Sequence, residues 1–107
     1  MKTSQRSVTK ADKILWDLMA TIIGCIACRK DGNFNPEVSI HHVHGRTAPG
    51  CHKKVLPLCG PHHQQDDTDK MGRIAVHPWK SQWEAKYGNQ DDLIEEVYLL
   101  IGIKYAP

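Results

Sequence analysis

The sequence predicts one small α+β domain, in which two short strands and a helix form the centre and longer helices flank it. Its 107 residues are enough for a single domain. Apolar residues recur at helical spacing near both ends, while short runs at residues 37–43 and 55–58 have the pattern of strands. Only 40% of the residues are hydrophobic, so the core is modest and an additional stabilising element is expected.

The N-terminal segment, residues 1–8, is predicted to be a flexible arm, and residues 9–107 a single domain. Thr9 and Asp12 have the spacing of a capping box, which starts a helix. We expect that helix over residues 10–23, because apolar residues recur there every three or four positions and a glycine follows as a C-cap.

The middle of the chain is predicted to be a pair of strands between loops. Residues 24–36 are expected to be a loop, and residues 37–43 a strand whose successive side chains face opposite sides. A loop rich in glycine, proline and cations covers residues 44–54. Residues 55–58 then form a second strand, whose proline suits an edge position.

Helices are predicted to dominate the C-terminal half. A short helix is expected over residues 60–70, and irregular chain follows it. In a helix over residues 78–87, Trp79 and Trp83 are interpreted as core packing rather than as platforms for base stacking. Asn89 caps a last helix with an apolar stripe.

The charge pattern narrows the class of protein. The net charge is only +2, but residues 1–54 hold nine Lys or Arg against four Asp or Glu, and residues 55–107 hold five against eight. An acidic second half argues against a protein that coats nucleic acid over its whole surface. A local basic face on the first half stays open, beside an ordinary solvated surface.

The chain also lacks the patterns of membrane and secreted proteins. No apolar run approaches the length of about 20 residues that spans a membrane, and the polar start lacks the apolar middle of a signal peptide. We therefore expect a cytoplasmic protein, whose four cysteines bind metal rather than form disulfides.

Two closely spaced pairs of soft ligands are the strongest motif. Cys25 and Cys28 form the first pair, and Cys59 and His62 form the second. Two such pairs brought together make a closed tetrahedral site, which is typical of structural zinc. The alternative, four unrelated small residues in a core, explains the spacing poorly. Cys51 is left over, and we expect it to be a free thiol.

The remaining histidines indicate a second site. Adjacent strand residues face opposite sides, so one of His41 and His42 can face His63 on the following helix. Asp67, one turn later, could join them. A divalent ion beside a neutral imidazole suits phosphodiester hydrolysis, because this reaction needs a base and a metal that neutralises the departing oxygen. The alternative is that these histidines extend the zinc site or lie on the surface.

Three runs of sequence carry a resemblance to a known superfamily: CIAC at residues 25–28, IHHVHG at residues 40–45 and LPLCGPHH at residues 56–63. Together they resemble the zinc-bearing HNH endonucleases and imply their ββα-metal core. The isolated His77 and the run WEAKYG at residues 83–88 extend the resemblance to the phage Ref family of RecA-dependent recombination-enhancement nucleases.

The resemblance implies a role for each matching residue. His42 would be the general base, and His41 and His63 would be ligands of the catalytic metal ion. His77 would bind that ion or orient phosphate, the alternative being a structural histidine before a proline.

The chain departs from the family at the middle asparagine of the HNH motif, which usually braces the base. Lys54, Lys53 or His52 occupies that stretch. Together with Arg46, the two lysines are expected to line a groove and hold the DNA backbone, a contact that carries no sequence information.

As a whole, the resemblance implies a metal-dependent DNA endonuclease with structural Zn²⁺ and a catalytic Mg²⁺, Mn²⁺ or other divalent ion. A RecA filament on single-stranded DNA would direct the cut in phage recombination. One alternative is a zinc-stabilised DNA-binding or recombination accessory module without cleavage, which the complete histidine set disfavours. The other is an HNH nuclease that acts in restriction or phage DNA packaging.

Overall fold

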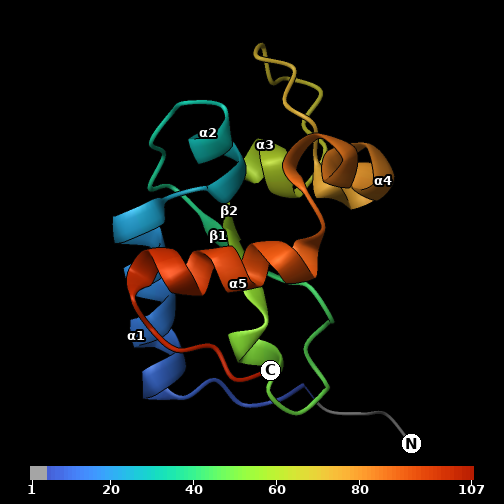
Figure 1. Cartoon of the computed structure of the whole chain (residues 1–107). Helices are drawn as coiled ribbons and strands as arrows, with labels where there is room; N and C mark the ends of the chain where they lie inside the picture. Colours follow the sequence, from blue (N-terminus) through green and yellow to red (C-terminus); the bar gives the residue numbers. More distant parts are fainter. Residues whose placement is uncertain (1–4) are drawn as a thin grey trace, which may run out of the picture.

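Two antiparallel strands form the centre of the molecule, whose computed structural model describes residues 5–107. β1 (Ser39–His42) pairs with β2 (Val55–Leu58), and α5 crosses this hairpin (Figure 1). The α+β class is therefore as predicted. The other elements, in chain order, are α1 (Lys10–Leu18), the π-helical turn η1 (Met19–Ile23), α2 (Ile26–Lys30), the 3-10 turn η2 (Cys51–Lys53), α3 (Gly60–His63), α4 (Val76–Tyr87) and α5 (Gln90–Ile101).

The helix predicted over residues 10–23 begins at the predicted residue, but α1 ends at Leu18 and the π-helical turn η1 covers residues 19–23. The Thr9 hydroxyl accepts a hydrogen bond from the Asp12 N–H, and the Asp12 carboxylate accepts one from the Thr9 N–H. The chain leaves η1 at Gly24, whose φ of 69° favours glycine. Gly24 also allows a close approach, because a Cβ there would lie 2.6 Å from the Asn35 carbonyl oxygen.

Two predicted bounds in the middle of the chain are wrong. The segment 24–36 is not all loop, because the Cys25 sulfur accepts a hydrogen bond from the Cys28 N–H and α2 begins there. The first strand is shorter than residues 37–43, since only Ser39–His42 pairs with β2.

The helix predicted over residues 60–70 is also wrong, since α3 ends after a single turn at His63. The next residue, Gln64, has an extended backbone (φ −132°, ψ 144°) and forms a bridge with His77. Residues 64–70 are polar, so a longer helix would have no apolar face to bury.

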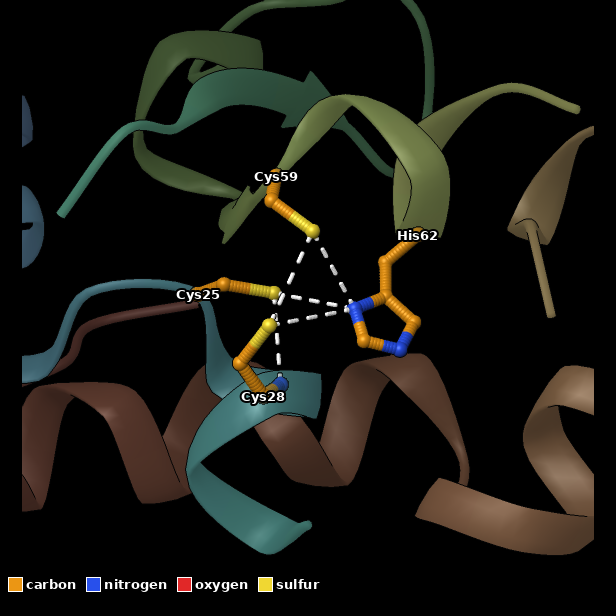
Figure 2. A group of neighbouring side chains, drawn as sticks. All are labelled: Cys25, Cys28, Cys59 and His62. Carbon is orange, nitrogen blue, oxygen red and sulfur yellow. Dashed lines mark hydrogen bonds between the residues drawn. The ribbon is translucent and has the colours of Figure 1, made fainter. Parts of the chain in front are cut away.

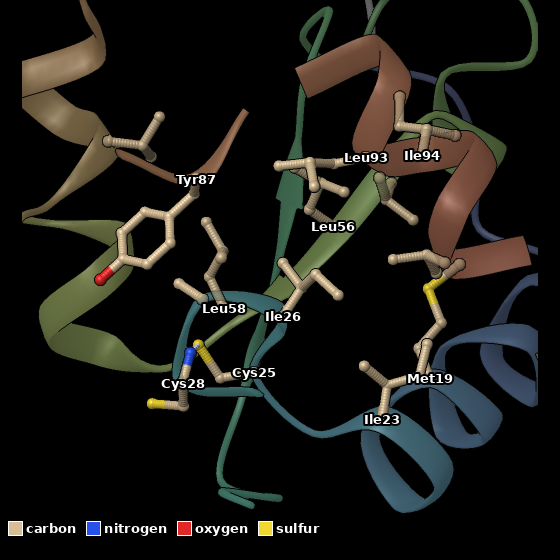
Figure 3. Packing of buried hydrophobic residues seen from close by; sticks show 14 of the residues in the cluster. Met19, Ile23, Cys25, Ile26, Cys28, Leu56, Leu58, Tyr87, Leu93 and Ile94 are labelled. Carbon is tan, nitrogen blue, oxygen red and sulfur yellow. Dashed lines mark hydrogen bonds between the residues drawn. The ribbon is translucent and has the colours of Figure 1, made fainter. Parts of the chain in front are cut away.

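The hydrophobic core lies between β2 and the helices around it. Met19 and Ile23 of η1, Leu56 of β2, and Leu93 and Ile94 of α5 pack in one buried cluster (Figure 3). Residues from α2 and α4 belong to the same cluster. Within residues 5–107, no helix is both long and apolar enough to cross a membrane.

The two tryptophans of α4 have different environments. Trp83 is fully buried, as predicted, but Trp79 is 44% exposed, so its assignment to the core is wrong. The backbone at Trp79 is not helical (φ −96°, ψ 45°), and the predicted four-residue spacing on one helix face therefore fails.

The start of the described chain is attached to the loop that follows β1. The backbone N–H and the Nε of Arg6 donate to the carbonyl oxygens of Arg46 and Thr47, both at 2.8 Å. Residues 1–4 of the predicted flexible arm lie outside the described residues, and the flexibility of the arm stays a prediction.

Candidate active site and metal centre

Two cysteines at the start of α2 and two residues at the start of α3 point toward one another (Figure 2). Cys25 and Cys59 are the residues immediately before the two helices, and Cys28 and His62 follow three positions later. One donor atom from each of the four lies within 4.8 Å of the others, and all four residues are buried. The structure thus brings together the four predicted zinc ligands, while the fourth cysteine, Cys51, is buried and free as expected.

The distances among the donor atoms fit a tetrahedral metal ion. His62 Nδ1 lies 3.4 Å from the sulfur of Cys25 and 3.2 Å from that of Cys59. The sulfur of Cys28 lies 3.5 Å from the same nitrogen and 3.7 Å from the sulfur of Cys59. Zinc bonds of about 2.3 Å to sulfur and about 2.0–2.1 Å to nitrogen predict separations of about 3.8 Å between sulfurs and about 3.6 Å between sulfur and nitrogen. The cluster can therefore bind a metal ion such as zinc.

Tyr87 and Asp31 orient the His62 ring. The Tyr87 hydroxyl donates to the Asp31 carboxylate (2.7 Å), so its oxygen accepts a hydrogen bond from Nε2 of His62 (3.0 Å). Nε2 therefore carries the proton, and Nδ1 keeps the lone pair that faces the three sulfurs.

The sulfurs of this cluster differ in their affinity for protons. The pKa of Cys59 is lowered to about 3, mainly because Cys25 donates a hydrogen bond to its sulfur, and the backbone N–H of His62 adds to the effect. The same bond, together with burial, raises the pKa of Cys25. One sulfur is thus held as the thiolate, which is the form that binds metal. A bound cation would release the protons of the other two thiols.

Three histidines from different elements form a second cluster. His41 lies on β1, His63 ends α3, and His77 lies at the start of α4. The ring centroids of His41 and His63 are 5.1 Å apart, and those of His41 and His77 are 5.0 Å apart. Their donor atoms lie within 4.8 Å of one another. The N–H of Gln65 donates to the His77 carbonyl (2.9 Å), which attaches the start of α4 to the chain after α3.

Hydrogen bonds select the nitrogen that each ring can offer to a metal. His41 Nε2 lies 2.7 Å from the side-chain oxygen of Gln90, which can only accept. Nε2 of His41 therefore carries the proton, and Nδ1 is left for a metal. The Ser39 hydroxyl donates to the Leu58 carbonyl oxygen (3.4 Å), so its oxygen accepts a hydrogen bond from Nδ1 of His63 (2.8 Å), and Nε2 of His63 keeps its lone pair. Partners of this kind fix the orientation of histidine ligands in metal sites.

Both of these rings are neutral at neutral pH. Burial lowers the pKa of His41 to about 4, and the nearby rings of His63 and His77 add to the effect. Burial also lowers the pKa of His63, and His77 and Arg46 lower it further. Because a metal binds the neutral imidazole, His41 and His63 have the protonation state that a divalent ion requires.

His42, the predicted base, is not part of the three-histidine cluster. Its Nε2 lies 2.9 Å from Nδ1 of His52 in η2, and its ring meets the Trp16 ring edge-on with centroids 5.6 Å apart. Burial lowers the pKa of His42, and the guanidinium of Arg46 lowers it further. A neutral His42 ring can accept a proton at neutral pH.

His42 and the residues of the three-histidine cluster all line one groove of about 620 Å³. Arg46 and Lys80 contribute positive charge to its lining. Lys53 instead pairs with Asp12 (3.5 Å) beside a separate hollow, and Lys54 is not part of the groove lining. The expectation that Lys53 and Lys54 line the groove with Arg46 is therefore wrong, and their contact with DNA stays a prediction.

Asp67 does not join the second cluster. Because α3 ends at His63, Asp67 is not one helical turn beyond it, and its carboxylate accepts a hydrogen bond from Gln65 Nε2 (2.7 Å) instead. The inference that Asp67 contributes to the metal site is wrong.

Sequence reasoning missed the residues that orient the ligands and one cation of the groove. Ser39 and Gln90 are polar residues without a characteristic spacing, so no pattern marks them. Tyr87 belongs to the run WEAKYG that carries part of the family resemblance, and this signal could have identified it. Lys80 lies three residues after His77, and only the shape of the groove shows its position.

A comparison with protein-family models gives a match over residues 8–101 to the family described as "Recombination enhancement, RecA-dependent nuclease". The match covers most of the chain, including both clusters and every residue of the groove named above. It confirms the resemblance to the Ref family that the sequence motifs indicate.

Proposed function

The chain belongs to the family of RecA-dependent recombination-enhancement nucleases, and from this we propose that it is a metal-dependent DNA endonuclease of the HNH type. The observation that carries the proposal is the juxtaposition in one groove of His42, a neutral ring outside any ligand cluster, with His41, His63 and His77. The order β1, β2, α3 supports a ββα-metal core, because both clusters include a residue of α3.

His42 is the general base in this proposal. A water molecule in the groove gives a proton to the His42 ring and attacks the phosphorus atom of the scissile phosphodiester. The pKa of His42 is lowered by burial, so the ring is unprotonated and ready to accept at neutral pH.

His41 and His63, with His77 as the third donor, would hold a divalent ion such as Mg²⁺ or Mn²⁺. A bound ion of this kind would supply charge that stabilises the phosphate and the departing 3′-oxygen. The residues fit it, because all three rings offer nitrogen donors within 4.8 Å of one another. An imidazole-rich donor set favours transition ions over Mg²⁺ in affinity.

The groove would hold DNA through its backbone. Arg46 and Lys80 lie in the lining, and such cations bind phosphate without reading sequence. The products would carry 5′-phosphate and 3′-hydroxyl ends. The family description supports a RecA filament as the partner that presents the DNA.

Nicking of supercoiled plasmid tests the proposal, with Mg²⁺ or Mn²⁺ and with or without a RecA filament. His42→Ala should lower the cleavage rate by about 10²–10⁴-fold while zinc content and DNA affinity stay unchanged, because only the base is lost. His44→Ala is the matched control, since His44 is a neighbouring but exposed histidine paired with Asp91. Equal loss in both variants, or none in His42→Ala, would remove His42 from the mechanism.

The same assay distinguishes the proposed nuclease from the main alternative, a DNA-binding accessory module without cleavage. A purified wild-type chain that binds DNA but cuts no DNA under any of these conditions would favour that alternative. A His63→Ala chain that keeps its zinc but loses cleavage would favour the nuclease, since His63 lies in the second cluster only.

A further inference from the structure

We propose that His52 is a positioning residue, which fixes the tautomer and orientation of the His42 ring so that Nδ1 of His42 stays unprotonated and can take the proton from water. The proposal rests on the proposed function only in that His42 is the base. It assigns to this chain a histidine where the family resemblance leads one to expect an asparagine.

The contacts place His52 between His42 and the N-terminal segment. His52 Nδ1 lies 2.9 Å from His42 Nε2, and His52 Nε2 lies 2.8 Å from the carbonyl oxygen of Arg6. The two imidazole rings are nearly perpendicular, with centroids 5.1 Å apart. His52 is only 6% exposed, so these contacts have little competition from water.

The carbonyl oxygen of Arg6 determines which ring nitrogens of His52 and His42 carry a proton. A carbonyl oxygen can only accept, so the nitrogen 2.8 Å from it, Nε2 of His52, must carry a proton. In a neutral ring Nδ1 of His52 is then an acceptor, and the bond to His42 requires that Nε2 of His42 donates. The remaining nitrogen of His42, Nδ1, keeps its lone pair.

The opposite arrangement is unfavourable. If His42 carried its proton on Nδ1, His52 would have to donate from its own Nδ1, and its bare Nε2 would face the Arg6 carbonyl at 2.8 Å. Two lone pairs would then oppose each other at 2.8 Å, at the cost of an unsatisfied acceptor pair. In the proposed arrangement the bare Nδ1 of His42 also faces a carbonyl oxygen, that of Ile40, but at 3.3 Å, so the repulsion there is weaker. That oxygen can receive a hydrogen bond once Nδ1 has gained a proton.

His52 is itself held firmly in place. Trp16 Nε1 donates to the His52 carbonyl oxygen (2.9 Å), and the Trp16 ring meets the His52 ring edge-on with centroids 5.6 Å apart. The Lys53 carbonyl next to it accepts from the Tyr98 hydroxyl. A rigid partner of this kind keeps a base in its productive orientation, as the third member of a catalytic triad does.

Two substitutions separate the two bonds of His52. The oxygen of an asparagine side chain occupies roughly the place of Nδ1, so His52→Asn keeps an acceptor for His42 and loses the donor to Arg6. The nitrogen of a glutamine side chain occupies roughly the place of Nε2, so His52→Gln keeps the donor to Arg6 and loses the acceptor for His42.

The variants give opposite results if the proposal is right. With saturating Mn²⁺ and DNA presented on a RecA filament, His52→Gln should lose about 10–10²-fold in kcat, a part of what a general base contributes. KM and zinc content should not change. His52→Asn should keep a kcat closer to that of the wild type than His52→Gln does. Equal losses in both variants, or a larger loss in His52→Asn, would overturn the proposal, because a merely structural role depends on both bonds.

A measurement without catalysis keeps the proposal testable if a variant fails to fold or the wild type does not cut DNA. In the zinc-loaded wild-type chain labelled with ¹⁵N-histidine, NMR at pH 8 observes imidazoles in their neutral form, since the ordinary histidine pKa is about 6.5. We expect a proton on Nε2 and a bare Nδ1 for His42, and a proton on Nε2 for His52. His44→Gln and His42→Gln identify signals by their loss.

The NMR result and the nicking assay have separate meanings. His42 with its proton on Nδ1, or exchanging equally between both nitrogens, overturns the role of His52 whatever the enzyme does. The expected tautomer in a chain that cuts no DNA contradicts the proposed function, while the arrangement of the two rings stands.

Discussion

Tyr87 makes the direct hydrogen bond that orients the ring of His62, a proposed zinc ligand. Its hydroxyl bridges His62 Nε2 and the Asp31 carboxylate. Tyr87→Phe removes this bridge but keeps the ring that packs in the core. We expect zinc affinity to fall by about 10–100-fold, the usual effect of losing such a partner. Competition with a chromophoric chelator measures it.

Tyr98→Phe is the control for this prediction. Like Tyr87, Tyr98 is buried and its hydroxyl donates a hydrogen bond. Its acceptor is the Lys53 carbonyl oxygen, and it does not contact the zinc cluster. Zinc affinity that falls equally in both variants would mean that Tyr87 acts through general stability and not through His62.

The sequence predicts the clustered cysteines and histidines better than the residues that orient them. The four residues of the first cluster could be predicted from their spacing alone, and the pairing of a strand histidine with His63 from strand and helix geometry. His77 was indicated only by the family resemblance. The partners Gln90, Ser39 and Tyr87 come from other elements. Their role depends on tertiary packing, and a glutamine or a serine in the sequence does not show which ring it will face.

At the scale of elements, the turn at Gly24 determines how the first cysteine reaches its site. The N–H of Cys25 donates to the Asn35 carbonyl (2.8 Å), and a Cβ at position 24 would lie 2.6 Å from that oxygen. Gly24→Ala therefore meets both a clash with backbone and a strained φ. We expect the free energy of unfolding to fall by about 1–3 kcal/mol, measured by urea denaturation of the zinc-loaded chain.

Gly32→Ala separates the two causes. Gly32 also has a positive φ, of 89°, but a Cβ there would meet nothing within 4 Å. In Gly32→Ala the free energy of unfolding should fall by about 1 kcal/mol, because this variant suffers backbone strain but no clash. A loss in Gly24→Ala that is no larger than in Gly32→Ala would show that the close approach to Asn35 contributes nothing.

Long and short elements differ in how well the sequence predicts them. The apolar stripes of α1 and α5 and their caps at Thr9 and Asn89 were sufficient to predict both helices. The short helix α2 was missed, and α3 was predicted too long. In both, a cysteine precedes the first residue of the helix and the length is set by contacts with other segments. The spacing of apolar residues cannot predict helices this short, because a single turn is too short to show a repeat.

At the scale of the whole molecule, we expect the small core to make folding depend on zinc bound at Cys25, Cys28, Cys59 and His62. Zinc binding in small domains contributes on the order of 10–16 kcal/mol to folding, which is as large as the whole usual stability of a domain, about 5–15 kcal/mol. We expect Cys28→Ala to unfold or aggregate, and a strong chelator to abolish the thermal transition of the wild type. Circular dichroism with elemental analysis measures both. Folded protein that contains no zinc would contradict this prediction.

The charge distribution over the molecule leads to a prediction about DNA. With a net charge of only +2, few phosphates can be neutralised at once, so binding to bare duplex should be weak and sensitive to salt. Arg46→Glu with Lys80→Glu, in the groove, should weaken cleavage and binding together without loss of zinc. Nicking and fluorescence anisotropy at several salt concentrations measure these effects.

Lys53→Glu with Lys54→Glu makes the same change of charge outside the groove lining. If this variant lost more DNA binding and cleavage than the groove variant, the DNA would have to run over η2 rather than through the groove. Vigorous cutting of bare duplex at physiological salt, unchanged by a RecA filament, would favour a nuclease that acts without a partner.

One peptide bond joins the two proposed metal sites, since His62 belongs to the zinc cluster and His63 to the three-histidine cluster. The turn of α3 that positions one ring therefore positions the other. Two ligands that depend on one structural element are thermodynamically linked, and the linkage is reciprocal. If loss of zinc weakens binding of the catalytic ion by some factor, occupancy of the catalytic site must tighten zinc by the same factor. Zinc supply would then set the level of nuclease activity, and a cell short of zinc would have a protein that can neither fold fully nor cut.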